Sequence, residues 1–155
     1  MRAQLPQTRT SNRTNSEGFT LIELIIAAAI LAIISAVAIP IYSSYSVSTY
    51  RAEAQSDLLL CAQGMERFAA ENFSYVGAAD GAGNINAQVC RIGSTERYNI
   101  SVVADATSFT LTATPLTGGP VGADGFMTVE STGQRFWDQN NSGTIDADED
   151  TWEQN

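Results

Sequence analysis

The chain has 155 residues, enough for one domain with a modest hydrophobic core. Its 8 Lys+Arg are outnumbered by 17 Asp+Glu, so simple repulsion disfavours DNA or anionic lipid as a direct ligand. It has no histidine, which removes the commonest general base, the usual catalytic triads and most zinc sites. Composition therefore points away from an enzyme.

The N-terminal region consists of a polar, basic segment followed by a long apolar one. Residues 1–18 are rich in Ser, Thr, Asn and Arg and predict a leader peptide. No residue between positions 24 and 50 is charged, and residues 24–41 are about long enough to cross a ~30 Å hydrocarbon layer. Arginines before this segment and an acidic region after it predict a cytoplasmic N-terminus and an external C-terminal domain.

One long helix is predicted from residue 19 to about residue 70. Its first half is apolar on all sides, which suits lipid or a protein bundle. In its second half the apolar residues recur at helical spacing and form one stripe: Ala54, Leu58, Cys61, Met65 and Phe68. We expect this stripe to pack on a sheet, with Arg51 and other charged residues elsewhere around the helix. Pro40 lacks an N–H and should kink or locally open the helix.

The second half of the chain has the alternation typical of strands, after a Gly-, Ala- and Asn-rich connection at residues 71–97. Alternate apolar residues at 98–102 and 109–113 define two strands joined by a hairpin turn at 105–108. Two shorter strands are predicted at 126–130 and 134–137. Sequential short strands imply an antiparallel meander. The expected fold class is therefore α+β, a long N-terminal helix whose amphipathic half packs on a small antiparallel sheet.

The two cysteines, Cys61 and Cys90, lie in the region predicted to be external. In an oxidising compartment a cysteine pair most often forms a disulfide. Such a bond would pin the 71–97 connection onto the helix stripe, and loop entropy gives it a value of about 3–4 kcal/mol. The alternative is a pair of buried free thiols.

The junction between the leader and the apolar segment differs from an ordinary secretory signal, in which a small-residue cleavage site follows the apolar stretch. Here Gly18 precedes it, and the sequence continues Phe-Thr-Leu-Ile-Glu-Leu through residue 24. A lone carboxylate such as that of Glu23, at the edge of an uncharged span, is costly unless it finds a partner. This run resembles the class III signal of type IV pilins and pseudopilins. The resemblance extends to Pro40 and the helix that follows and, less closely, to residues 62–68, 73–75 and 132–135.

This resemblance implies a specific maturation and assembly pathway. A prepilin peptidase would cleave after Gly18, Phe19 would be N-methylated, and Glu23 would neutralise the amine of a neighbouring subunit's Phe19. Opposite charges in an apolar bundle are tolerable only when paired. The alternative is that Glu23 only favours the first helical turn through the helix dipole. The implied organisation is a leader at 1–18, a transmembrane and assembly helix at 19–50 that includes Pro40, and a globular pilin domain at 51–155.

The function implied by the resemblance is that of a type IV pilus subunit, major or minor, that polymerises through its N-terminal helix. The subunit would reside in the bacterial inner membrane before assembly and then in an extracellular pilus serving adhesion, twitching motility or DNA uptake. Its partners would be other pilin subunits, the prepilin peptidase and the inner-membrane assembly machinery, without direct nucleic-acid binding.

The sequence leaves two rival functions. The first is a pseudopilin of a type II secretion system, whose major subunits use calcium near the C-terminus. The cysteine pair, and the absence of the Trp-Gly-containing C-terminal signature of that branch, favour a pilin. The second is a membrane-tethered enzyme, which the lack of histidine and of a nucleophile arrangement disfavours.

Residues 138–149 match the twelve-residue calcium loop of EF-hands at every diagnostic position. Gly143 permits the sharp turn. The expected oxygen ligands are Asp138, Asn140, Ser142, the backbone carbonyl of Thr144, Asp146 and Glu149. The flanking segments do not resemble EF-hand helices, so an EF-like loop on another fold is expected, and the alternative is a solvated acidic tail. Bound calcium would hold the acidic C-terminus in place without a disulfide.

Overall fold

The structure, a computed structural model, describes residues 18–80, 82–90 and 97–153. The chain divides into two compact units, Met1–Ile39 and Pro40–Asn155, which are described separately. The predicted leader lies outside the described residues except for Gly18.

Helix α1, Leu21–Asn72, begins with a cap made by its own sequence. The backbone N–H of Glu23 donates to the Thr20 hydroxyl at 3.3 Å. This is the usual N-cap hydrogen bond, which satisfies one of the free N–H groups at the start of a helix. Thr20 and Glu23 stand at the spacing of a capping box. The helix assignment then runs through Pro40 without interruption, and the kink or local opening expected there stays a prediction.

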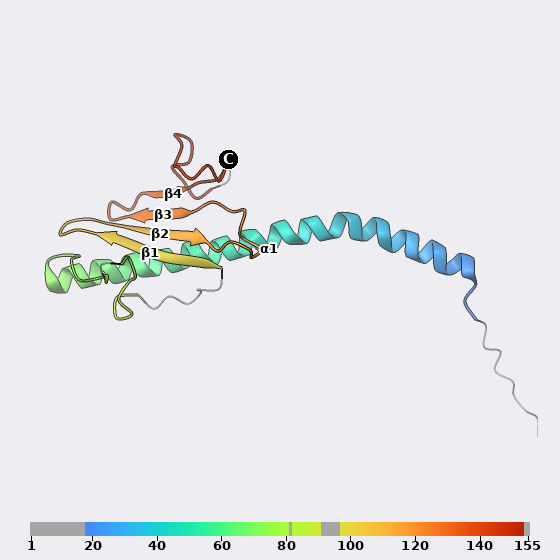
Figure 1. Cartoon of the computed structure of the whole chain (residues 1–155), viewed down its shortest axis with the longest axis horizontal. Helices are drawn as coiled ribbons and strands as arrows, with labels where there is room; N and C mark the ends of the chain where they lie inside the picture. The colour runs from blue at the N-terminus through green and yellow to red at the C-terminus, as the bar shows by residue number, and fades with distance from the viewer. Residues whose placement is uncertain (1–17, 81, 91–96, 154–155) are drawn as a thin grey trace, which may run out of the picture. The chain divides into compact units, whose positions relative to one another are not determined.

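Four strands form one antiparallel sheet in the order β1-β2-β3-β4, as Figure 1 shows. They are β1 (Tyr98–Ala104), β2 (Phe109–Pro115), β3 (Met127–Glu130) and β4 (Arg135–Trp137). Neighbours in sequence are neighbours in the sheet, so the predicted meander is confirmed. The predicted hairpin turn is also confirmed, because the Asp105 N–H donates to the Ser108 carbonyl at 2.9 Å.

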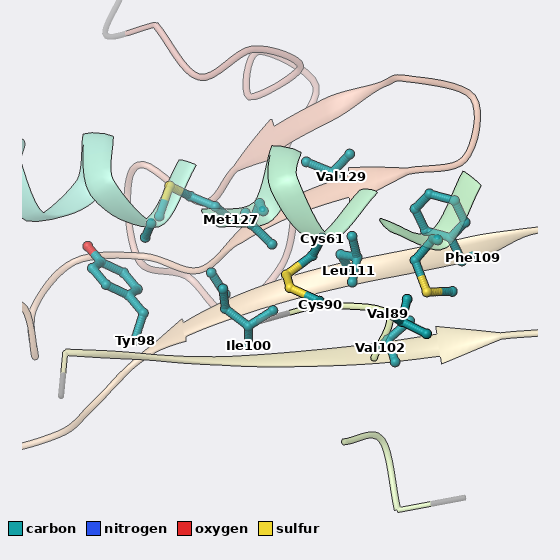
Figure 2. Packing of buried hydrophobic residues seen from close by; sticks show 14 of the residues in the cluster. Cys61, Val89, Cys90, Tyr98, Ile100, Val102, Phe109, Leu111, Met127 and Val129 are labelled. Carbon is teal, nitrogen blue, oxygen red and sulfur yellow. A yellow bond between two sulfur atoms is a disulfide. The ribbon is translucent and has the colours of Figure 1, made fainter. Parts of the chain in front are cut away.

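The hydrophobic core lies between the second half of α1 and one face of the sheet (Figure 2). The predicted helix stripe is confirmed, with Phe68 partly buried and the others buried. Alternate strand residues meet it, as their register requires: Val102 pairs with Leu111, and Leu111 with Val129. The α+β fold class expected from the sequence is therefore correct.

One helical residue differs from expectation. Arg51 lies on the core-facing side of α1, and its side chain is only 12% exposed. It stands three residues before Ala54 and seven before Leu58, so the helical period places it in the stripe rather than elsewhere around the helix.

Candidate functional site

In the N-terminal unit, the apolar part of α1 has no internal partner. Every described side chain from residue 18 to residue 39 is exposed, and Phe19 is 85% exposed. The most apolar 18-residue window of α1 has a mean hydropathy of 2.9, and among the described residues this is the one helix long and apolar enough to cross a membrane. An apolar surface of this extent must be covered by lipid or by other protein.

Among the described residues, neither packing at Gly18 nor a partner for the Glu23 carboxylate explains the choice of these two residues. A Cβ added at Gly18 would meet no atom of the described part of the chain within 4 Å, so packing against that part does not demand glycine there. Beyond the backbone bond to Thr20, no hydrogen bond or ion pair reaches the Glu23 carboxylate from the described residues. The described part of the fold does not require these two residues, so a partner outside it could explain them.

The entry of α1 into the globular domain is fixed by an ion pair that the sequence reading missed. The Arg51 guanidinium makes two bonds to the Asp124 carboxylate, at 2.9 and 2.8 Å. The guanidinium also lies over the Trp137 ring, with its central carbon 3.8 Å from the ring centroid. The helical phase of Arg51 was the available signal, but nothing in the sequence pointed to Asp124, which is 73 residues away.

Tyr98 completes this cluster. Its hydroxyl donates to the Asp124 carboxylate in a short, buried bond. Burial, and then the hydrogen bond to Asp124, raise the pKa of Tyr98 well above its ordinary value. The neutral phenol is therefore the form that the fold requires.

A disulfide joins Cys61 of α1 to Cys90, with Cα atoms 4.8 Å apart, as Figure 2 shows. The predicted pairing is confirmed, and with it the attachment of the connecting segment to the helix. Beside the bridge, a Cβ at Gly64 would lie 1.9 Å from the Val89 carbonyl oxygen, so only glycine allows this approach. Sequence analysis did not identify Gly64.

The acidic loop at residues 138–149 is closed by its first and last carboxylates. Asp138 is fully buried, and its oxygens accept the N–H groups of Ser142 and Gly143, each at 2.8 Å. Glu149 is 5% exposed and accepts the N–H groups of Asn140 and Asp146, at 3.1 and 2.9 Å. Carboxylate oxygens still have free lone pairs after such bonds.

The other predicted ligands contribute differently. The Asn140 amide donates to Asp146 at 2.8 Å, and the Ser142 hydroxyl donates to the Thr144 carbonyl at 3.0 Å. No group of three or more His, Cys, Asp or Glu side chains within the described ranges is arranged to hold a metal ion. The loop thus brings Asp138 and Glu149 inward, and its buried carboxylates contradict a purely solvated tail at these two positions.

The loop is also attached to the rest of the domain. The backbone N–H of Trp137 donates to the Glu149 carbonyl at 3.3 Å, beside the outer edge of β4. The Trp152 indole N–H donates to the Phe136 carbonyl at 3.1 Å. A Cβ at Gly125 would lie 1.5 Å from the Asp138 carbonyl oxygen, so glycine permits the close packing behind the loop.

A capped apolar helix without internal cover, continuing into an amphipathic half packed on a four-stranded antiparallel meander, defines a pilin-type protein. Two family models match the sequence. The prokaryotic N-terminal methylation motif matches residues 13–39. A model described as type IV minor pilin ComP, DNA uptake sequence receptor, matches residues 40–124, more than half of the chain. The chain therefore belongs to the type IV minor pilin ComP family and is a type IV pilus subunit.

The solved structures support the same fold. The non-core minor pilin PilV of Neisseria meningitidis superposes with a TM-score of 0.52 at 18% sequence identity, covering 67% of this chain and 97% of that one. No curated protein sequence matches. These findings do not favour the type II secretion pseudopilin. The family and fold are structural rather than enzymatic, and the methylation motif implies processing and assembly with other pilins.

Proposed function

We propose that this chain is a minor subunit that a prepilin peptidase cleaves after Gly18 and that enters an extracellular pilus through its apolar helix. Before assembly the same helix holds it in the inner membrane. The observation that carries the proposal is the exposure of every described side chain from residue 18 to residue 39, within the stretch 13–39 that matches the methylation motif. Its role is structural, without catalytic activity.

Glu23 is the residue we assign to subunit docking. Its carboxylate has no partner from the described residues, although an unpaired charge among apolar side chains is costly. Pairing with the methylated amine of a neighbouring Phe19 would offset that cost only inside a filament. Pro40, also on the apolar helix, is proposed to serve assembly rather than folding, since α1 tolerates it without interruption.

Mass spectrometry of the mature chain tests processing, with Phe19 carrying one methyl group as the expected N-terminus. An N-terminus elsewhere would overturn the assignment. Docking is tested by measuring how much of this subunit is present in sheared filaments. Glu23→Gln, which keeps the size of the side chain, should leave the subunit inserted and folded but deplete it from filaments.

Glu71→Gln is the matched control for docking, because it removes one exposed carboxylate from the far end of the same helix. It should enter filaments at the wild-type level. Equal incorporation of Glu23→Gln and Glu71→Gln would refute the charge-pair role.

A role as the DNA receptor itself is a second candidate, favoured by the description of the matched family. The charge of the domain opposes it, since residues 40–155 contain five Arg and fifteen Asp+Glu. Arg51 and Arg97 are moreover paired with Asp124 and Glu53. We therefore propose that any part in DNA uptake is played through the filament. Retention of duplex DNA by the purified full chain at low salt, lost at high salt, would instead support direct binding.

We also propose that residues 138–149 bind calcium, with oxygens from Asp138, Asn140, Ser142, Thr144, Asp146 and Glu149. The support is the EF-hand spacing together with the inward, buried carboxylates at its first and last positions. Positive φ at Asn141 and Gly143 gives the loop the tight turns that such a site needs. Calcium would neutralise carboxylates that otherwise repel one another.

A further inference from the structure

The end of the globular domain where α1 terminates presents an apolar surface that neither the core nor the assembly helix uses. Its large side chains are Phe73, Val76 and Val103, which are 93%, 63% and 78% exposed. Val76 and Val103 line the same hollow, of about 530 Å³, between the helix exit and the end of β1. We call these three residues and that hollow the end patch.

Phe73 places an aromatic side chain at a backbone position that favours glycine or asparagine. Phe73 has a φ of +56°, in the left-handed region that a bulky aromatic residue rarely adopts and that Gly or Asn would adopt more readily. Its ring is at the same time almost fully exposed, so packing within the domain does not explain the choice of residue. The left-handed conformation itself belongs to the helix end, where the Phe73 N–H donates to the Ala69 carbonyl at 2.7 Å. The exposed aromatic ring is what the cap does not require.

The hollow is rigidly built. The Tyr75 ring packs edge-on against Phe109, with centroids 5.0 Å apart, and the Tyr75 hydroxyl donates to Glu66 at 3.0 Å. On the other side, the Val102 N–H donates to the Gly83 carbonyl at 2.9 Å. Both walls are therefore fixed before any partner arrives, which reduces the ordering cost of binding.

On each wall of the hollow, a carboxylate residue is the sequence neighbour of a lining residue. Asp80 lies beside Ala79, and hydrogen bonds from Asn84 hold the pKa of Asp80 below its ordinary value. Asp105 follows Ala104, and the backbone N–H of Thr107 lowers the pKa of Asp105 to about 2. Both are exposed and ionised at neutral pH, and no arginine from the described residues lines the hollow.

We propose that the end patch docks a different protein through a segment that combines an apolar side chain with flanking Lys or Arg. Val76 and Val103 at the hollow contact the apolar side chain, and Asp80 and Asp105 attract the basic groups. A second copy fits poorly, because residues 40–155 have no lysine and only five Arg against fifteen Asp+Glu, so two copies repel one another. The same acidity repels nucleic acid and anionic lipid.

The test uses the full chain in neutral detergent micelles and records the methyl resonances of its valines. The probe is the peptide acetyl-Lys-Leu-Phe-Leu-Lys-amide, and the matched peptide has Glu in place of both Lys. The Lys peptide should shift the Val76 and Val103 methyls in a saturable way that weakens with added salt. The Glu peptide should not shift them. Equal shifts with both peptides, or none with the Lys peptide at millimolar concentration, would overturn the proposal.

Three variants sharpen the test. Val103→Asp should weaken binding by about tenfold or more, whereas Leu60→Asp, the same change at an exposed helix position outside the hollow, should not. Asp105→Asn keeps the oxygen that accepts the turn N–H groups and should mainly reduce the salt dependence. Methyl shifts that grow with protein concentration in the absence of peptide, and that vanish in Val103→Asp, would assign the patch to a second copy and refute the proposal.

Discussion

The two halves of α1 belong to one continuous helix but differ in what covers them. Residues 21–39 expose every side chain, whereas in the second half Ala54, Leu58, Cys61 and Met65 are buried against the sheet. The first half has apolar residues on all sides, and the second has them on one stripe. A helix that is apolar on all sides therefore indicates a covering of lipid or other protein. A helix with one apolar stripe indicates packing against the chain's own core.

The largest expected effect contrasts one residue from each half. Leu58 is fully buried, so Leu58→Ala should lower the free energy of unfolding by about 3–5 kcal/mol through lost burial and a cavity. Ile30 is 53% exposed, and Ile30→Ala should change the stability of the detergent-solubilised chain by less than about 0.5 kcal/mol. Denaturant unfolding followed by tryptophan fluorescence measures both, and similar losses would break the comparison.

Removal of the disulfide should have the next largest effect. The bridge closes a sequence separation of 29 residues, for which loop entropy predicts a loss of about 3–4 kcal/mol in Cys61→Ala/Cys90→Ala. Reductant should destabilise the wild-type chain by a similar amount and leave the double variant unchanged. A wild-type melting curve that does not respond to reductant would show that the helix and connecting segment hold together without the bridge.

How far the sequence predicts this molecule depends on the range of each interaction. The helix stripe, the hairpin at 105–108 and the sheet order follow from spacing and neighbouring residues, and all are observed. Arg51 paired with Asp124, and Gly64 against the Val89 carbonyl, depend on the packing of segments far apart in sequence. A periodic pattern does not predict such contacts, because each depends on one residue meeting a distant segment.

The candidate sites divide in the same way. Gly18, Phe19 and Glu23 form a contiguous motif, and the methylation-motif match covers it. The disulfide was predictable because only two cysteines were available. The end patch was not, since Val76 and Val103 line one hollow only after the connecting segment folds beside β1.

Tyr98→Phe probes the cluster that fixes the entry of α1 into the domain. Loss of the bond to the charged Asp124 should cost about 2 kcal/mol at neutral pH, without loss of the ring's packing. The folded-state pKa of Tyr98 is raised, so its contribution is complete below about pH 10 and is lost as the pH rises further, when the unfolded chain ionises first. Unfolding curves from pH 7 to pH 11 should therefore converge for the two chains, and parallel curves would contradict this account.

The smallest expected effect is that of calcium, and it tests whether the C-terminal loop resembles the first half of α1 in needing an external partner. Extracellular EF-like sites bind in the range of about 10⁻⁴ to 10⁻³ M. At 5 mM calcium, mass action then stabilises the folded chain by about 1–2 kcal/mol. Calorimetry and thermal unfolding measure binding and stabilisation, and magnesium should substitute poorly because it demands a tight octahedron.

Glu149→Gln is the decisive variant for this calcium prediction. It preserves side-chain size and one amide acceptor while removing a charge from the last ligand position, so the calcium effect should disappear. Asp150→Asn removes an equal charge from the next, exposed residue and should keep the effect. If both variants bind calcium like the wild-type chain, or if none shows heat at millimolar calcium, the loop is closed by its own backbone amides. The buried Asp138 and Glu149 carboxylates would then serve folding alone, as the stripe of α1 does.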